Sequence, residues 1–169
     1  MFYDGWGDPE LLDWLVDQTR ELGPPGEIEV HWTDSKRHRD GSHTFSGWFR
    51  TPASHLPLPP EVRTAYFQLL LPPDPFDLPR PGVCVHLAGT GDLTYAARKH
   101  LARPLLSHEN PADRIGALIL QNPYYAERRP QGQRQTRLRR MTDQIMMNLT
   151  TVQEARALLK WLSGEGFPR

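Results

Sequence analysis

The sequence has a single cysteine, Cys84, and no net charge. One cysteine excludes an intramolecular disulfide and a zinc site built from several cysteines. Because 20 Lys and Arg balance 20 Asp and Glu, no overall field draws the protein to nucleic acid or anionic lipid, so any basic function has to be local. Nucleic acid is therefore not expected as a partner.

Long apolar runs are also missing. None approaches the roughly 18 residues of a membrane span, and the N-terminus MFYDGWGDPELLDW carries acids where a signal peptide has basic residues. We therefore expect a soluble, cytoplasmic protein without a transmembrane segment.

Proline is abundant instead, with 17 residues that cluster at 52–60 and 72–81. Such clusters are typical of surface connections between elements. A chain of 169 residues is long enough for one core. We expect a single domain over 1–169, in which 1–82 form an N-terminal helix and antiparallel strands and 83–167 form a βαβα unit.

The first part begins with a helix signal: Asp8 is a candidate N-cap, and Pro9 suits the first helical position. Apolar and polar residues then alternate in 28–32 and 45–49, on either side of the polar turn SKRHRDGS, and a third strand is expected over 64–71. The pattern predicts antiparallel pairing.

The second part has two runs, 83–88 and 115–120, that are apolar on both faces except for His86. Strands of this kind belong to parallel sheets covered by helices, so Cys84 is expected to be a small core residue. Residues 95–107 supply the crossover helix. Apolar residues three or four apart predict a long amphipathic helix from Thr136 to the stop at Gly164.

The first apolar strand ends in the glycine turn Gly89-Thr90-Gly91. A dinucleotide fingerprint needs Gly or Ala at position 94, which is Thr94, and an acid after the next strand, which is absent. Two interpretations remain open: an oxyanion loop whose backbone amides face a developing negative charge, and a tight turn without chemistry.

Two further candidates are histidine and arginine clusters. His86 either approaches a pocket or is a satisfied core histidine, and the seven histidines show no ligand spacing, so no metal is expected. Residues 128–140 hold six arginines and no acid. They are either a solvated loop and first helix turn or an element that binds an anionic partner such as a lipid surface.

Separated segments of the sequence, in order along the chain, resemble the α/β hydrolase domain-containing protein 18 family. They read GWGDPELL (5–12), DGSHTFSGWFRTPASHLPLP (40–59), HLAGTGD (86–92), ARPLL (102–106), QNPYY (121–125) and LLKWLSGEGF (158–167). The resemblance implies an α/β fold that is the N-terminal portion of an α/β hydrolase, with antiparallel edge strands followed by a βαβα parallel unit.

The resemblance also implies a serine nucleophile, an acyl-ester or lipid-ester substrate, and no cofactor. In this fold the loop after the first buried strand donates one oxyanion amide. Thr90 is then the candidate donor and Gly91 the next. Tyr124 and Tyr125 either line the mouth of the pocket or pack at the strand end.

The sequence departs from the family pattern because it contains no G-x-S-x-G elbow. None of its serines has a strand-elbow-helix context, so we expect no catalytic residue in this chain and no activity of the chain alone. The domain is then incomplete, and an exposed sheet edge would favour association. The alternative is a noncatalytic binding module that uses residues 128–140 on an anionic partner.

Overall fold

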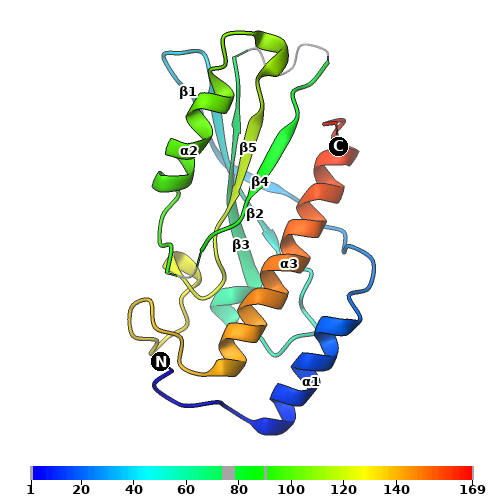
Figure 1. Cartoon of the computed structure of the whole chain (residues 1–169), viewed down its shortest axis with the longest axis vertical. Helices are drawn as coiled ribbons and strands as arrows, with labels where there is room; N and C mark the ends of the chain where they lie inside the picture. The colour runs from blue at the N-terminus through cyan, green and yellow to red at the C-terminus, as the bar shows by residue number, and fades with distance from the viewer. Residues whose placement is uncertain (1, 74–78, 90, 169) are drawn as a thin grey trace.

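The computed structural model describes residues 2–73, 79–89 and 91–168, which form a five-stranded mixed sheet with helices on both faces (Figure 1). The strands are β1 (His31–Arg37), β2 (His43–Arg50), β3 (Thr64–Leu71), β4 (Val83–His86) and β5 (Gly116–Leu120). The helices are α1 (Pro9–Arg20), α2 (Ala96–Leu106) and α3 (Met141–Gly164). Short 3-10 turns lie at η1 (Pro60–Arg63), η2 (Pro111–Asp113) and η3 (Ala126–Arg128).

The strand order in the sheet is β1-β2-β3-β5-β4. The pairs β1–β2, β2–β3 and β3–β5 are antiparallel. β4 and β5 pair in parallel and are joined by α2. β5 therefore lies between β3 and β4, although it follows both in sequence. This confirms the predicted α/β class with antiparallel edge strands.

The two long helices after the antiparallel strands cover opposite faces of the sheet (Figure 1). On one face, Ala102 and Leu106 of α2 pack against Leu70, Ala117 and Ile119. On the other face, the apolar side of α3 packs against the remaining strand residues. That cluster includes Phe49, Phe67, Leu118, Leu120, Leu158 and Leu162.

The N-terminal helix packs against α3 rather than on the sheet. Its start follows the predicted cap, because the Asp8 carboxylate accepts hydrogen bonds from the backbone N–H groups of Glu10 (2.9 Å) and Leu11 (3.4 Å). Leu15 is fully buried in a cluster with Met146 and Met147 of α3. In Figure 1, α1 lies beside the lower half of α3.

Two element boundaries differ from the sequence expectation. β1 begins at His31 rather than Ile28, since the ladder with β2 starts at His31 opposite Trp48, and it continues to Arg37, three residues into the predicted turn. α3 begins at Met141 rather than Thr136. The reason is that the preceding backbone pairs with the N-terminal segment: the Asp4 amide donates to the Arg139 carbonyl (2.8 Å).

The prediction that Cys84 is a core residue is wrong, because its side chain is exposed. β4 is an edge strand in the described sheet, and it is half-buried rather than covered on both faces. Cys84 lies opposite Ala117, on the face that α2 covers. α2 packs over β3 and β5 but not over β4, so the Cys84 side chain stays exposed.

The close approach of β5 to its neighbours generates a stability prediction. A Cβ added to Gly116 would lie 3.0 Å from both the Leu70 carbonyl oxygen and the Leu71 Cδ2. Backbone atoms cannot give way cheaply, so we expect Gly116→Ala to lower the free energy of unfolding by about 1–3 kcal/mol. Urea denaturation followed by circular dichroism measures it.

Gly82→Ala is the matched control, since a Cβ there has no neighbour within 4 Å. Its stability should be unchanged or slightly raised, because alanine restricts the unfolded chain. Equal effects of the two substitutions would contradict the close packing of β5.

Candidate active site at the carboxyl ends of the parallel strands

Because β4 and β5 are parallel, their carboxyl ends meet at the same edge of the sheet. The loop 87–95 follows β4 and the segment 121–125 follows β5. In open α/β sheets, ligands bind outside the carboxyl ends of the strands. Of the predicted site residues, His86 ends β4, Gly91 lies in the loop after it, and Tyr124 and Tyr125 follow β5, while Thr90 lies outside the described residues.

The loop after β4 turns at Gly91, which has a φ of +86°. This left-handed conformation is accessible to glycine without a Cβ penalty. The Asp92 amide donates to the Gly89 carbonyl (3.2 Å) and closes the turn. The Gly91 amide faces the Tyr125 hydroxyl closely enough to act on its pKa, although the geometry falls short of a hydrogen bond.

Arg98 of α2 anchors this loop to both parallel strands. Its Nη1 donates to the carbonyl oxygens of Leu120 (2.5 Å) and His86 (3.3 Å), at the last residues of β5 and β4. Its Nε donates to the Asp92 carboxylate (2.9 Å). The Arg98 side chain is buried, so these charge-assisted bonds form away from water and fix the loop relative to the strand ends.

Asn122 connects the same loop to the helix on the other face. Its Nδ2 donates to the Gly89 carbonyl (3.3 Å), and its Oδ1 lies 3.3 Å from the Thr151 hydroxyl of α3. The loop after β4 is therefore held from α2 through Arg98 and from α3 through Asn122. A backbone fixed on two sides keeps its amide directions, which is a requirement for stabilising a charged intermediate.

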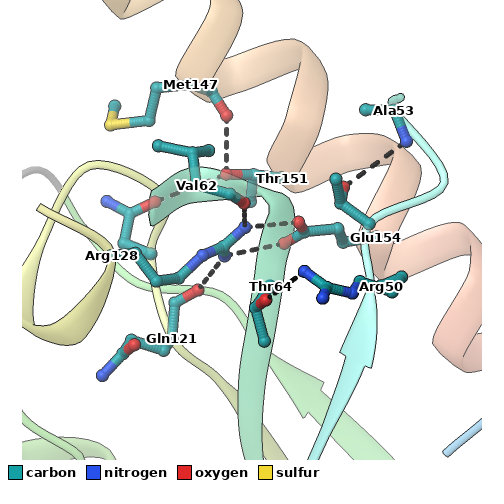
Figure 2. A network of polar contacts seen from close by, with 11 residues as sticks. Arg50, Ala53, Val62, Thr64, Gln121, Arg128, Met147, Thr151 and Glu154 are labelled. Atoms are coloured by element: carbon teal, nitrogen blue, oxygen red, sulfur yellow. Dashed lines mark hydrogen bonds and ion pairs between the residues drawn. The ribbon is translucent and has the colours of Figure 1, made fainter. Parts of the chain in front are cut away.

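A fully buried ion pair forms between Arg128 of η3 and Glu154 of α3 (Figure 2). Nη1 lies 2.9 Å from Oε2, and Nη2 lies 2.5 Å from Oε1. The guanidinium also donates to the carbonyl oxygens of Gln121 (2.9 Å) and Val62 (2.8 Å). The pair therefore joins the end of β5, η1 and α3.

The two tyrosines after β5 are both buried. Tyr124 has a φ of 67°, unusual for a residue with a side chain, and its carbonyl accepts a hydrogen bond from Gln133 (2.8 Å). Its hydroxyl points at the Met146 sulfur (3.8 Å), and burial raises its pKa. Burial also raises the pKa of Tyr125, and the Gly91 amide opposes this effect. Tyr124 packs in the core, and Tyr125 faces the loop.

His86 ends β4 with its ring half-buried. In the described part of the chain, its Nε2 is buried without a hydrogen-bond partner. Burial lowers the pKa of the imidazole, and the positive charge of Arg98 lowers it further. The ring is therefore held in its neutral form, as expected for a histidine beside a buried guanidinium.

The arginine-rich segment 128–140 is not a uniform basic surface. Arg128 has no exposed area, Arg139 pairs with Asp4 (2.8 Å), and the Arg134 guanidinium lies over the Tyr3 ring (5.4 Å). Arg128 is thus unavailable to a partner, contrary to its inclusion in the predicted binding segment.

The described residues contain no group of three His, Cys, Asp or Glu that could hold a metal, and no described helix is long and apolar enough to span a membrane.

Sequence reasoning missed both buried arginines. A signal was present, because Arg98, Ala102 and Leu106 are four residues apart and therefore share a buried stripe of α2. Glu154 likewise lies on a stripe with Thr150 and Leu158 of α3. A charged residue within an apolar stripe predicts a buried, paired charge.

The mixed sheet with helices on both faces and the glycine loop at the carboxyl end of a parallel strand are features of the α/β hydrolase class. The sequence model of the family described as alpha/beta hydrolase domain containing 18 matches residues 1–169, and the chain belongs to this family.

Among solved structures, the chain is similar to the rice cell wall degrading esterase LipA from Xanthomonas oryzae in a ligand-bound form. The identity is 13% and the TM-score is 0.40, over 86% of this chain and 40% of that chain. The chain thus spans well under half the length of that esterase.

The buried ion pair generates a stability prediction. Arg128→Met or Glu154→Leu alone should lower the free energy of unfolding by about 3–5 kcal/mol, since each leaves an unpaired charge in the core. The double variant removes both charges and should recover most of the loss. Chemical denaturation of the two single variants and the double variant measures the coupling, and strictly additive losses would contradict a buried pair.

The lowered pKa of His86 generates a pH prediction. Between the folded-state value and the ordinary value of about 6.5, the unfolded chain binds a proton that the folded chain does not. The free energy of unfolding should therefore fall as the pH drops through this window. His86→Gln should flatten this dependence between pH 7.5 and 5.5, whereas His100→Gln on the exposed side of α2 should keep it. Identical profiles for both variants would argue against the role of His86.

Proposed function

We propose that these residues form the oxyanion-loop part of a serine hydrolase that cleaves acyl-ester bonds. The observation that carries the proposal is the Gly91 turn at the end of β4, anchored through Arg98 to both strand ends. The substrate is a small-molecule or lipid ester.

In this mechanism, the amides of the loop stabilise the negative charge that develops on the ester oxygen. Thr90 and Gly91 are the proposed donors, and the absence of a side chain at Gly91 lets the carbonyl approach the backbone. One such donor typically contributes about 3–4 kcal/mol to the transition state.

The nucleophile is proposed to come from outside these residues, because the sequence has no G-x-S-x-G elbow. In the described sheet β4 pairs with β5 alone, so its outer edge is free to accept a strand. A strand added there in parallel would end beside the Gly91 loop. The chain without it should show no turnover, since loss of the nucleophile typically costs about a millionfold.

The alternative is a noncatalytic module that binds an anionic lipid surface through residues 128–140. Five of the six arginines keep exposed side chains, Arg139 among them although it pairs with Asp4, and Arg128 is buried. Vesicle binding that is lost in Arg129→Gln/Arg134→Gln and falls steeply with salt would favour this alternative.

The ester-hydrolase proposal predicts two results. The 169-residue chain should neither hydrolyse p-nitrophenyl butyrate above a denatured control nor react with a fluorophosphonate probe. The same residues, fused to the elbow-, acid- and histidine-bearing segments of a family member, should gain both activities. In that fusion, Gly91→Ala should lower kcat about 100-fold, because a side chain at a φ of +86° displaces the donor.

Gly82→Ala in the same fusion controls for the loss of a glycine as such. Fluorophosphonate labelling of a defined serine in the 169-residue chain would overturn the proposal that the nucleophile is supplied from elsewhere. An unchanged kcat in Gly91→Ala would remove the oxyanion role of the loop.

A further inference from the structure

A cavity lies at the opposite end of β5 from the candidate active site. It has a volume of about 590 Å³ and is bounded by the β1–β2 turn, the end of β3, α2 and the segment before β5. Its floor includes the buried side chains of Leu70 and Leu106. The volume falls within the roughly 300–1,000 Å³ typical of small-molecule sites.

The charge of this cavity is strongly one-sided. Three arginines and one lysine line it: Arg39, Arg103, Arg114 and Lys99. Among the described residues that line it, Asp40 is the one carboxylate, and it accepts hydrogen bonds from the Ser42 amide (3.0 Å) and hydroxyl (2.6 Å). These bonds lower the Asp40 pKa, so Asp40 keeps one negative charge against the four cations.

The two cations on α2 are unpaired and face the same side. Lys99 and Arg103 are four residues apart, so they are neighbours on the helix surface, where like charges repel. Within the described residues neither has a carboxylate in an ion pair. Lys99 is half-buried, and burial together with the charge of Lys36 lowers its pKa. An anion in the cavity would reduce the repulsion between Lys99 and Arg103 and would stabilise the charged form of Lys99.

The walls of the cavity are fixed before any ligand arrives. The turn closes through the His38 amide, which donates to the Ser42 carbonyl (2.8 Å), and through Gly41, whose φ is +84°. Gly41 also packs against Pro73: an added Cβ would lie 3.2 Å from the proline Cβ. On the other side, the Arg114 Nε is held by the His108 carbonyl (2.9 Å).

We propose that this cavity binds a phosphate-bearing ligand with at least two negative charges. Guanidinium groups match phosphate oxygens with paired N–H donors, and Lys99 adds a point charge. Four cations outnumber the one carboxylate among the described lining residues, so the cavity is suited to a multiply charged anion rather than to a single carboxylate. The ligand is either a soluble phosphorylated molecule or the phosphate headgroup of a lipid.

The test uses inorganic pyrophosphate as the soluble probe and phosphatidic acid vesicles as the lipid probe. Calorimetric titration with pyrophosphate at low salt should show one site in the wild-type chain. Lys99→Gln/Arg103→Gln should weaken binding at least tenfold. This variant should stay folded, because it removes a repulsive pair that is not part of the core.

The matched control is Arg129→Gln/Arg134→Gln, which removes the same number of charges from the other end of the molecule and should bind pyrophosphate like the wild type. If vesicles bind and pyrophosphate does not, loss of vesicle binding in Lys99→Gln/Arg103→Gln alone assigns the phosphate to a lipid. Absence of binding to both probes, or equal weakening in both double variants, would overturn the proposal. Neither result bears on the oxyanion loop, which the fusion enzyme tests separately.

Discussion

The buried pair of Arg128 and Glu154 is the interaction on which the candidate site depends most. Transferring two charges from water into a core costs several kcal/mol per ion, and the mutual attraction offsets this only if the remaining donors and acceptors are satisfied. Arg128 meets most of this condition through the carbonyl oxygens of Gln121 and Val62. The same bonds connect three segments that are distant in sequence, so their relative placement follows from satisfying one guanidinium.

Arg98, on the opposite face of the sheet, is likewise a buried guanidinium whose N–H groups are satisfied by distant segments. Its guanidinium is satisfied by the last carbonyls of β4 and β5 and by the Asp92 carboxylate. Two buried arginines therefore bracket the carboxyl ends of the parallel pair, one from α2 and the other beneath α3. The loop that carries Gly91 is positioned by charge satisfaction more than by apolar packing, and β4 is itself only half-buried.

Local signals in the sequence predicted what depends on local physics. The Asp8 cap, the bounds of β3 and the position of α2 follow from short-range patterns, and the structure confirms them. The exposure of Cys84 could not be read in this way, because it depends on which strands α2 happens to cover. The partner of Arg128 lies 26 residues away on another element, so the sequence did not reveal which of the six arginines in 128–140 is buried.

The two ends of β5 show why composition alone misleads about binding. At the carboxyl end, arginines are buried and their N–H groups are largely used by carbonyls and carboxylates, so they organise backbone and attract no ligand. At the amino end, Lys99 and Arg103 are grouped with Arg39, and the nearby Asp40 is already engaged by Ser42. Within the basic stretch that is conspicuous in the sequence, Arg128 is buried and Arg139 is paired with Asp4. The cations that line the cavity come from three separate segments, and only the fold brings them together.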